Sequence, residues 1–109
     1  MKELESKDYE LIGRYVVGES IKYINAINKH SELIHEQNEN DKAIHVAEEN
    51  KDMQALDSLY KKFREIKNDL IANRSFRQFQ LDKMMSNIDQ IVNPQDYMNP
   101  IKIEELTNE

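Results

Sequence analysis

The chain contains no cysteine and has only two glycines and two prolines in 109 residues. The lack of cysteine excludes disulfides, thiolate metal sites and thiol catalysis. No apolar run approaches the roughly 18–20 residues that a membrane span needs. The N-terminal residues also lack the apolar stretch of a signal peptide. We therefore expect a cytoplasmic protein.

Glycine and proline are both absent between Gly18 and Pro94. Glycine in a helix costs backbone entropy, and proline removes a hydrogen-bond donor and clashes with the preceding turn. The same stretch is rich in Ala, Leu, Glu, Lys, Gln, Arg and Met, which favour helices. This pattern predicts that most of the chain is helical.

The composition is less apolar than that of a typical globular domain. Hydrophobic residues make up 39% of the chain and charged residues 33%, against a usual charged share of about 25%. An elongated helical protein has this balance because it exposes much surface for each buried residue. The small apolar share also indicates that a second copy or a partner completes the core, so we expect a homo- or hetero-oligomer.

The apolar spacing predicts a first helix over about 7–38. Apolar residues on one face, from Tyr9 to Ile34, recur at intervals of three, four or seven positions. Ser6 is a candidate N-cap, with Asp8 in the first turn. The polar residues 35–42 predict the turn that follows. A weaker break lies at 48–52, where the helix either continues or restarts.

The second and third helices are predicted over about 41–72 and 76–92. In the second helix, five apolar residues are spaced by 3, 4, 3 and 4 positions, as in a helix-packing seam: Leu56, Leu59, Phe63, Ile66 and Leu70. The seam becomes polar at Asn73. Ser75 and Gln78 then match a capping box, so a new helix is predicted there.

These elements predict an all-α fold, either an antiparallel helical hairpin or a three-helix bundle. Residues 1–92 form one helical domain in this prediction, and residues 93–109 form an extended or disordered tail. Ile101 and Ile103 alternate as in a short strand. The tail is then either a strap over its own bundle or a peptide that docks on a partner.

Motifs for catalysis or metal binding are weak. Glu32 and His35 have the Glu-x-x-His spacing of di-iron bundles, but such bundles need two pairs and further glutamates. His30 lies on the apolar face of the first helix, where a hydrogen-bonded core residue is the usual explanation. No glycine-rich loop is available to hold phosphate. We expect no enzymatic activity, no cofactor and no metal site.

The apolar stripes predict a surface for a protein partner. We expect it to use whatever part of these stripes the chain does not bury itself. The candidate residues are Leu56, Leu59, Phe63, Ile66, Leu70, Leu81, Met84, Met85 and Ile88. The main hypothesis is a small helical regulator or adaptor that docks an amphipathic helix face on a partner protein. The Lys- and Asn-rich composition suggests a bacterial or phage source.

A basic stretch supports an alternative hypothesis. Residues 61–83 hold seven basic and three acidic residues, a net charge of +4, although the whole chain carries −6. Cations interleaved with aromatic residues can contact phosphates and stack on bases. The alternative is therefore a nucleic-acid-associated protein. Its candidate contacts are Lys61, Lys62, Arg64, Lys67, Arg74 and Arg77.

Part of the chain resembles a known family. The similar segments are Arg64-Glu-Ile-Lys-Asn-Asp-Leu70, Asn73-Arg-Ser-Phe-Arg-Gln-Phe79 and Ile88-Asp-Gln-Ile91. Through these segments, residues 52–92 resemble the C-terminal half of the YlbF/YmcA-like family of small bacterial helical proteins. The resemblance implies hetero-oligomeric regulatory assemblies without enzymatic activity, which act through partner proteins in processes such as RNA turnover and development. No functional residue is transferred from it.

Overall fold

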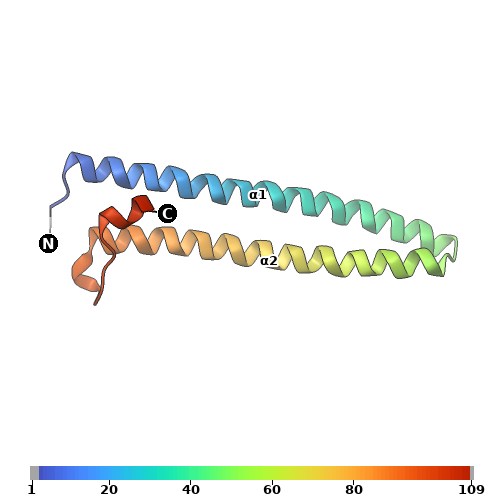
Figure 1. Ribbon diagram of the computed structural model, residues 1–109. Coiled ribbons are helices and arrows are strands. Elements are labelled where there is room, and N and C mark those ends of the chain that lie inside the picture. The colour runs from blue at the N-terminus through green and yellow to red at the C-terminus, as the bar shows by residue number, and fades with distance from the viewer. Residues whose placement is uncertain (1–2, 109) are drawn as a thin grey trace. The chain divides into compact units, whose positions relative to one another are not determined.

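The computed structural model describes residues 3–108, and this range contains helices and no β-strand. Helix α1 spans Ser6–Glu49 and helix α2 spans Met53–Val92. Two short 3-10 helices follow, η1 at Pro94–Asp96 and η2 at Ile103–Asn108 (Figure 1). The all-α prediction is confirmed. Residues 1, 2 and 109, which the predicted domain and tail included, lie outside the described residues.

The helix boundaries differ from the prediction of three helices over 7–38, 41–72 and 76–92. The polar residues 35–42 lie inside α1, and the predicted break after Asn73 lies inside α2. The weaker break at 48–52 is the one that contains the turn. A polar segment does not end a helix when its side chains are either solvated or hydrogen-bonded across to another helix, as described below.

The start of α1 also differs from the prediction. Ser6 is the first helical residue, and Glu5 precedes it. The buried carboxylate of Asp8 accepts a hydrogen bond from the backbone N–H of Glu5 at 3.0 Å. Asp8 therefore satisfies a free donor at the helix start, the role that a capping box normally gives to a glutamate.

The turn between α1 and α2 is a helix cap without glycine. The backbone N–H of Asp52 donates to the carbonyl of Ala47 at 2.9 Å, and that of Lys51 donates to the carbonyl of Glu48 at 3.1 Å. These two bonds define a Schellman motif. Lys51 has a φ of 53°, in the left-handed region that glycine usually occupies at this position. The carboxylate of Asp52 then caps α2 by accepting from the N–H of Ala55 at 3.1 Å.

We expect Lys51→Gly to stabilise the protein by about 0.5–1 kcal/mol, because glycine adopts a left-handed conformation without the steric cost of a Cβ atom. Urea unfolding followed by circular dichroism measures the change. Lys51→Ala is the matched control, since it removes the same charge but keeps the Cβ atom. Equal stability of the glycine and alanine variants would contradict the explanation.

The chain divides into two compact units. The second unit, Asn25–Arg77, is an antiparallel helical hairpin that contains the turn. Ile44, Ala47 and Leu56 form a buried cluster near the turn. Farther from the turn, Leu33 and Ile66 are 2% and 3% exposed. This unit is consistent with the predicted hairpin, and the described residues show no three-helix bundle.

The first unit combines the described residues up to Ile24 with those from Gln78 onward. In it, the beginning of α1 pairs with the end of α2, and the C-terminal segment packs against both. Tyr15, Ile91 and Leu106 form its buried cluster. Leu106 comes from η2, so the tail contributes to the core of its own unit.

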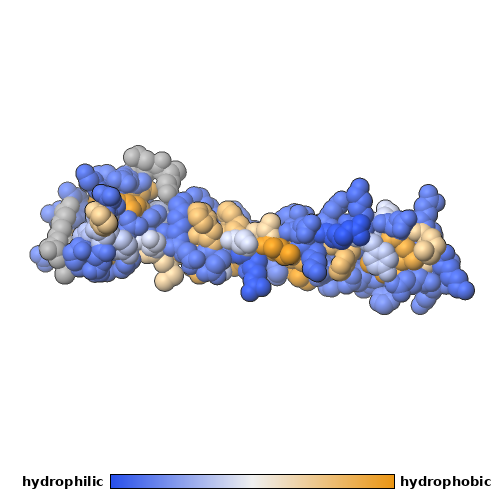
Figure 2. All heavy atoms as spheres, turned by 90° about the horizontal axis from the view of Figure 1, so that it is seen from below, coloured by the Kyte–Doolittle hydropathy of each residue, from blue (hydrophilic) through white to orange (hydrophobic). Residues whose placement is uncertain are grey.

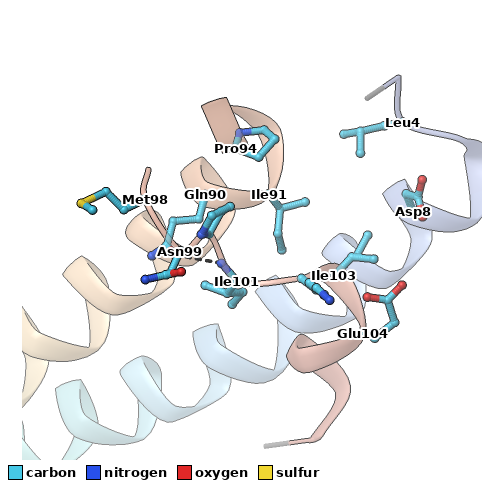
Figure 3. Close-up of a pocket in the computed structure, with 12 residues that line it drawn as sticks. Leu4, Asp8, Gln90, Ile91, Pro94, Met98, Asn99, Ile101, Ile103 and Glu104 are labelled. Atoms are coloured by element: carbon cyan, nitrogen blue, oxygen red, sulfur yellow. Dashed lines mark hydrogen bonds between the residues drawn. The ribbon is translucent and has the colours of Figure 1, made fainter. Parts of the chain in front are cut away.

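The tail packs on its own unit as a strap, one of the two predicted arrangements. It contains the short helices η1 and η2, which were not predicted, and Tyr97 after η1 has an extended backbone. Ile103 opens η2 and is not part of a strand. The N–H of Ile101 donates to the side-chain Oε1 of Gln90 at 3.0 Å, the dashed line in Figure 3. The hydroxyl of Tyr97 donates to Asp89. This hydrogen bond raises the pKa of Tyr97 and lowers the pKa of Asp89, because it stabilises the carboxylate.

Candidate functional site

The apolar seam predicted to bind a partner is used inside the hairpin. Leu56 and Ile66 are buried, whereas Leu59, Phe63 and Leu70 are half-buried. Leu59 and Phe63 pack against the cluster near the turn. Ile44 and Ala47 of α1 belong to that cluster, so this part of the seam packs against α1. This seam therefore contributes to the hairpin's own core, and the apolar residues that the chain leaves exposed are the stronger candidates for a partner surface.

The seam of α2 continues beyond Leu70 at the same spacing, but its side chains are mostly polar. Its positions are Asn73, Arg77, Gln80 and Asn87, with Met84 as the apolar exception. Each amide finds a specific partner. In the second unit, Asn73 Nδ2 donates to the carbonyl of Ala26 at 3.0 Å. In the first unit, Asn87 Nδ2 donates to the hydroxyl of Tyr15 at 2.8 Å. An apolar pattern cannot reveal such positions, so the sequence predicted a break there.

A similar bond lies on α1 of the hairpin. Asn40 is buried, and its Nδ2 donates to the carbonyl of Leu59 at 3.1 Å. His30, also on the inner side of α1, is half-buried. Its Nδ1 is buried and has no hydrogen-bond partner among the described residues. The partial burial of His30 matches the expectation, but its Nδ1 lacks the expected hydrogen bond.

The first unit has an open groove of about 280 Å³ between α1 and α2. Tyr23 and Ile24 line it from α1, and Leu81 and Met84 line it from α2. Ser20 completes its α1 wall, and the remaining lining residues are Glu19 and Gln80. Only Leu81 and Met84 of this set were predicted as partner contacts.

Glu19 and Gln80 form a buried polar pair within this groove. Each is 4% exposed, and Gln80 Nε2 donates to Glu19 Oε2. Lys22 Nζ donates to the other carboxylate oxygen at 3.2 Å. A buried carboxylate is tolerated only when it is paired and hydrogen-bonded, and these two donors meet that requirement.

Exposed apolar side chains lie close in sequence to the groove-lining residues on both helices. Val17 is 60% exposed and Ile24 is 53% exposed, and they lie two helical turns apart on α1. Met85 follows the lining residue Met84 on α2 and is 60% exposed. Ile88 is half-buried on the same helix. We call the groove together with Val17 and Met85 the apolar face. Figure 2 shows how hydrophobic side chains reach the surface of the molecule between hydrophilic ones.

The apolar face carries almost no charge. Between Tyr15 and Ile24 the only charged residues are Glu19 and Lys22, and these two pair with each other at 3.2 Å. Between Gln78 and Ile88 the charged residues are one acid and one base, Asp82 and Lys83. Each stretch is therefore neutral in a chain of net charge −6. Large exposed apolar patches on a protein typically mark interaction sites.

The predicted nucleic-acid contacts lie mainly on the surface of α2. Lys61, Lys62, Arg64, Lys67 and Arg74 are exposed, and none forms an ion pair with another described residue. Arg77 differs from them because it is half-buried and its Nε donates to Asn73 Oδ1 at 2.9 Å.

A second hollow, of about 480 Å³, lies beneath the C-terminal strap in the same unit. Leu4, Ile91 and Ile103 supply apolar side chains, and Asp8 and Gln90 supply polar ones (Figure 3). Asp8 and Gln90 already bind backbone N–H groups of the chain itself. The polar groups of this hollow therefore hold the strap and the helix start in place.

The described residues contain no group of three or more His, Asp or Glu side chains arranged to hold a metal ion. Within the same part of the chain, neither α1 nor α2 has a stretch that is long and apolar enough to cross a lipid bilayer.

Comparisons with known proteins gave no match. No protein-family model, curated protein or solved structure matches this chain. The resemblance of residues 52–92 to the YlbF/YmcA-like family stays a prediction.

Proposed function

We propose that this chain is a small, non-enzymatic, cytoplasmic protein–protein interaction module, a regulator or adaptor that binds a partner protein through the apolar face. The observation that carries the proposal is the neutral groove in the first unit with apolar side chains exposed around it. Burial of such side chains drives association at roughly 25 cal/mol per Å² of apolar surface removed from water.

The shape of the groove favours a helical partner. Its two walls are helices, and an amphipathic helix binds such a groove through apolar residues spaced by three and four positions. A helix seated there would turn the two-helix arrangement into a three-helix bundle, with the third helix supplied by the partner. The family resemblance implies the same mode of action, through partner proteins.

We expect Ile24→Glu to abolish partner binding, because a carboxylate buried in an apolar interface loses its hydration without a compensating bond. The test is affinity capture from an extract of the native host, with tagged wild type and variant compared by mass spectrometry. Val46→Glu is the matched control, since Val46 is also on α1, is 56% exposed and lies outside the apolar face.

The expected result is a protein recovered with wild type and with Val46→Glu but reduced at least about tenfold with Ile24→Glu, which corresponds to about 1.4 kcal/mol. If no recovered protein depends on residue 24, the proposed function is wrong. Circular dichroism spectra of all three proteins have to show the same helix content for the comparison to count.

A second candidate function is nucleic-acid association through α2. The observation in its favour is that Lys61, Arg64, Lys67 and Arg74 are exposed and unpaired within the described residues. Phosphate binding by such cations weakens steeply with salt. A salt-dependent mobility shift of RNA or DNA that is lost in the double variant Arg64→Glu, Arg74→Glu would support it. Absence of a shift at low salt would exclude it.

A further inference from the structure

The apolar face combines a hollow with a protruding side chain. The groove is the hollow, walled by Ile24 and Leu81. Met85 is adjacent to the lining residue Met84 and is 60% exposed. In an interface related by a two-fold axis, the same patch meets itself, so the patch has to offer both a protrusion and a place to receive it. Methionine suits the first role because its unbranched side chain adapts to irregular spaces.

The charge distribution favours this face for self-association. Two copies of a chain with net charge −6 repel each other. A two-fold contact brings many charged residues close to the equivalent residues, of the same sign, on the other copy. The neutral stretches 15–24 and 78–88 avoid this repulsion. By contrast, the exposed part of α1 from Glu32 to Glu49 carries six acidic residues and one lysine, so a self-contact there would be repulsive.

We propose that the occupant of the groove is a second copy of this chain, in a closed two-fold dimer in which Met85 of each copy enters the groove of the other. This inference rests on the proposed function, since it names the partner of the same face. Each groove is filled by the other copy. The exposed apolar side chains at the interface become buried when the dimer forms.

The first experiment measures molar mass by light scattering and sedimentation over a wide micromolar range. We expect the mass of wild type to rise from one chain to two and to stop there, because a two-fold contact closes on itself. Met85→Ala should weaken the dimer at least about tenfold. We expect this variant to fold as wild type does, because Met85 is exposed and alanine favours helices. Ile24→Glu should abolish the dimer, and Val46→Glu should leave it unchanged.

The second experiment uses the absence of cysteine from the chain. One copy carries Met85→Cys, the other carries Ser20→Cys and a tag, and a mild oxidant is added. We expect a disulfide between the two variants, because the proposed dimer places residue 85 of one copy beside the groove wall of the other. The control pair replaces Ser20→Cys with Val46→Cys and should cross-link much more slowly.

Several outcomes would overturn the dimer. In the mass measurement, these are a wild type that has the mass of one chain at every concentration, a mass that rises past two chains, and a Val46→Glu variant that loses the dimer as fully as Ile24→Glu. In the cross-linking experiment, it is equal cross-linking of the test pair and the control pair. The proposed function fails separately. If wild type is monomeric but still captures another protein through residue 24, only the dimer is excluded. If no contact of the chain depends on residue 24, both the dimer and the proposed function are excluded.

Discussion

Leu33→Ala is expected to lower the free energy of unfolding by about 2–3 kcal/mol, toward the lower end of the range for large-to-small substitutions in protein cores. Leu33 is the most buried hydrophobic side chain in the described part of the chain, at 2% exposure. The substitution removes its apolar contacts and leaves a cavity between two helices that relax only partly. Urea unfolding monitored by circular dichroism measures the change. All samples have to be at one protein concentration, since self-association would add to stability.

Ile71→Ala is the matched control for this result. It also truncates a large aliphatic side chain in the hairpin, but Ile71 is 57% exposed. We expect a change within about 0.5 kcal/mol, as for most surface substitutions. Similar losses at residues 33 and 71 would show that the hairpin does not bury the α1 residues that this structure places inside.

Gln80→Leu is expected to destabilise the protein by about 2 kcal/mol, although it makes the seam more apolar. The substitution removes the amide that donates to the buried Glu19 carboxylate. Glu19 then keeps only its bond to Lys22. Leaving a buried acceptor without a partner costs roughly 1–3 kcal/mol, and more when the group is charged.

The double variant Glu19→Leu, Gln80→Leu is expected to be at least as stable as wild type. Replacing both members of a buried polar pair by apolar residues of similar size is often neutral or stabilising. The four proteins, including Glu19→Leu alone, form a double-mutant cycle, and urea unfolding gives the coupling energy. Additive effects of the two substitutions would contradict a direct bond between these side chains.

The polar side chains that bond from one helix to the other also explain what fixes the register of the helix pair. A helix pair with only leucines and isoleucines at its interface can slide by one repeat and still bury apolar surface. Buried polar groups prevent this, because a shifted pair leaves them without partners, as a buried asparagine does in coiled coils. In the hairpin, Asn40 and Asn73 each reach a backbone carbonyl of the opposite helix. In the first unit, Asn87 and Gln80 reach specific side chains of α1.

The predicted partner residues show which part of the site could be read from spacing. The regular spacing from Leu56 to Leu70 correctly indicated a helix-packing seam, yet spacing cannot say which helix the seam packs against. The structure uses it for the chain's own hairpin. Leu81, Met84, Met85 and Ile88 contribute to or adjoin the groove. The α1 wall was missed because every predicted partner contact lies between residues 56 and 88, although Tyr23 belongs to the apolar stripe predicted for the first helix.

The sequence by itself determined that this protein is helical, because helix propensity and the lack of breakers act locally, within a few residues of chain. It also placed apolar residues on helix faces, since that periodicity is a property of one helix. Only the tertiary structure decided where the chain turns. At Lys51 and Asp52 the hydrogen bonds of the cap end α1 and start α2, whereas the equally polar residues 35–42 stay helical. The groove also depends on tertiary structure, because its walls meet only when residues far apart in the chain come together.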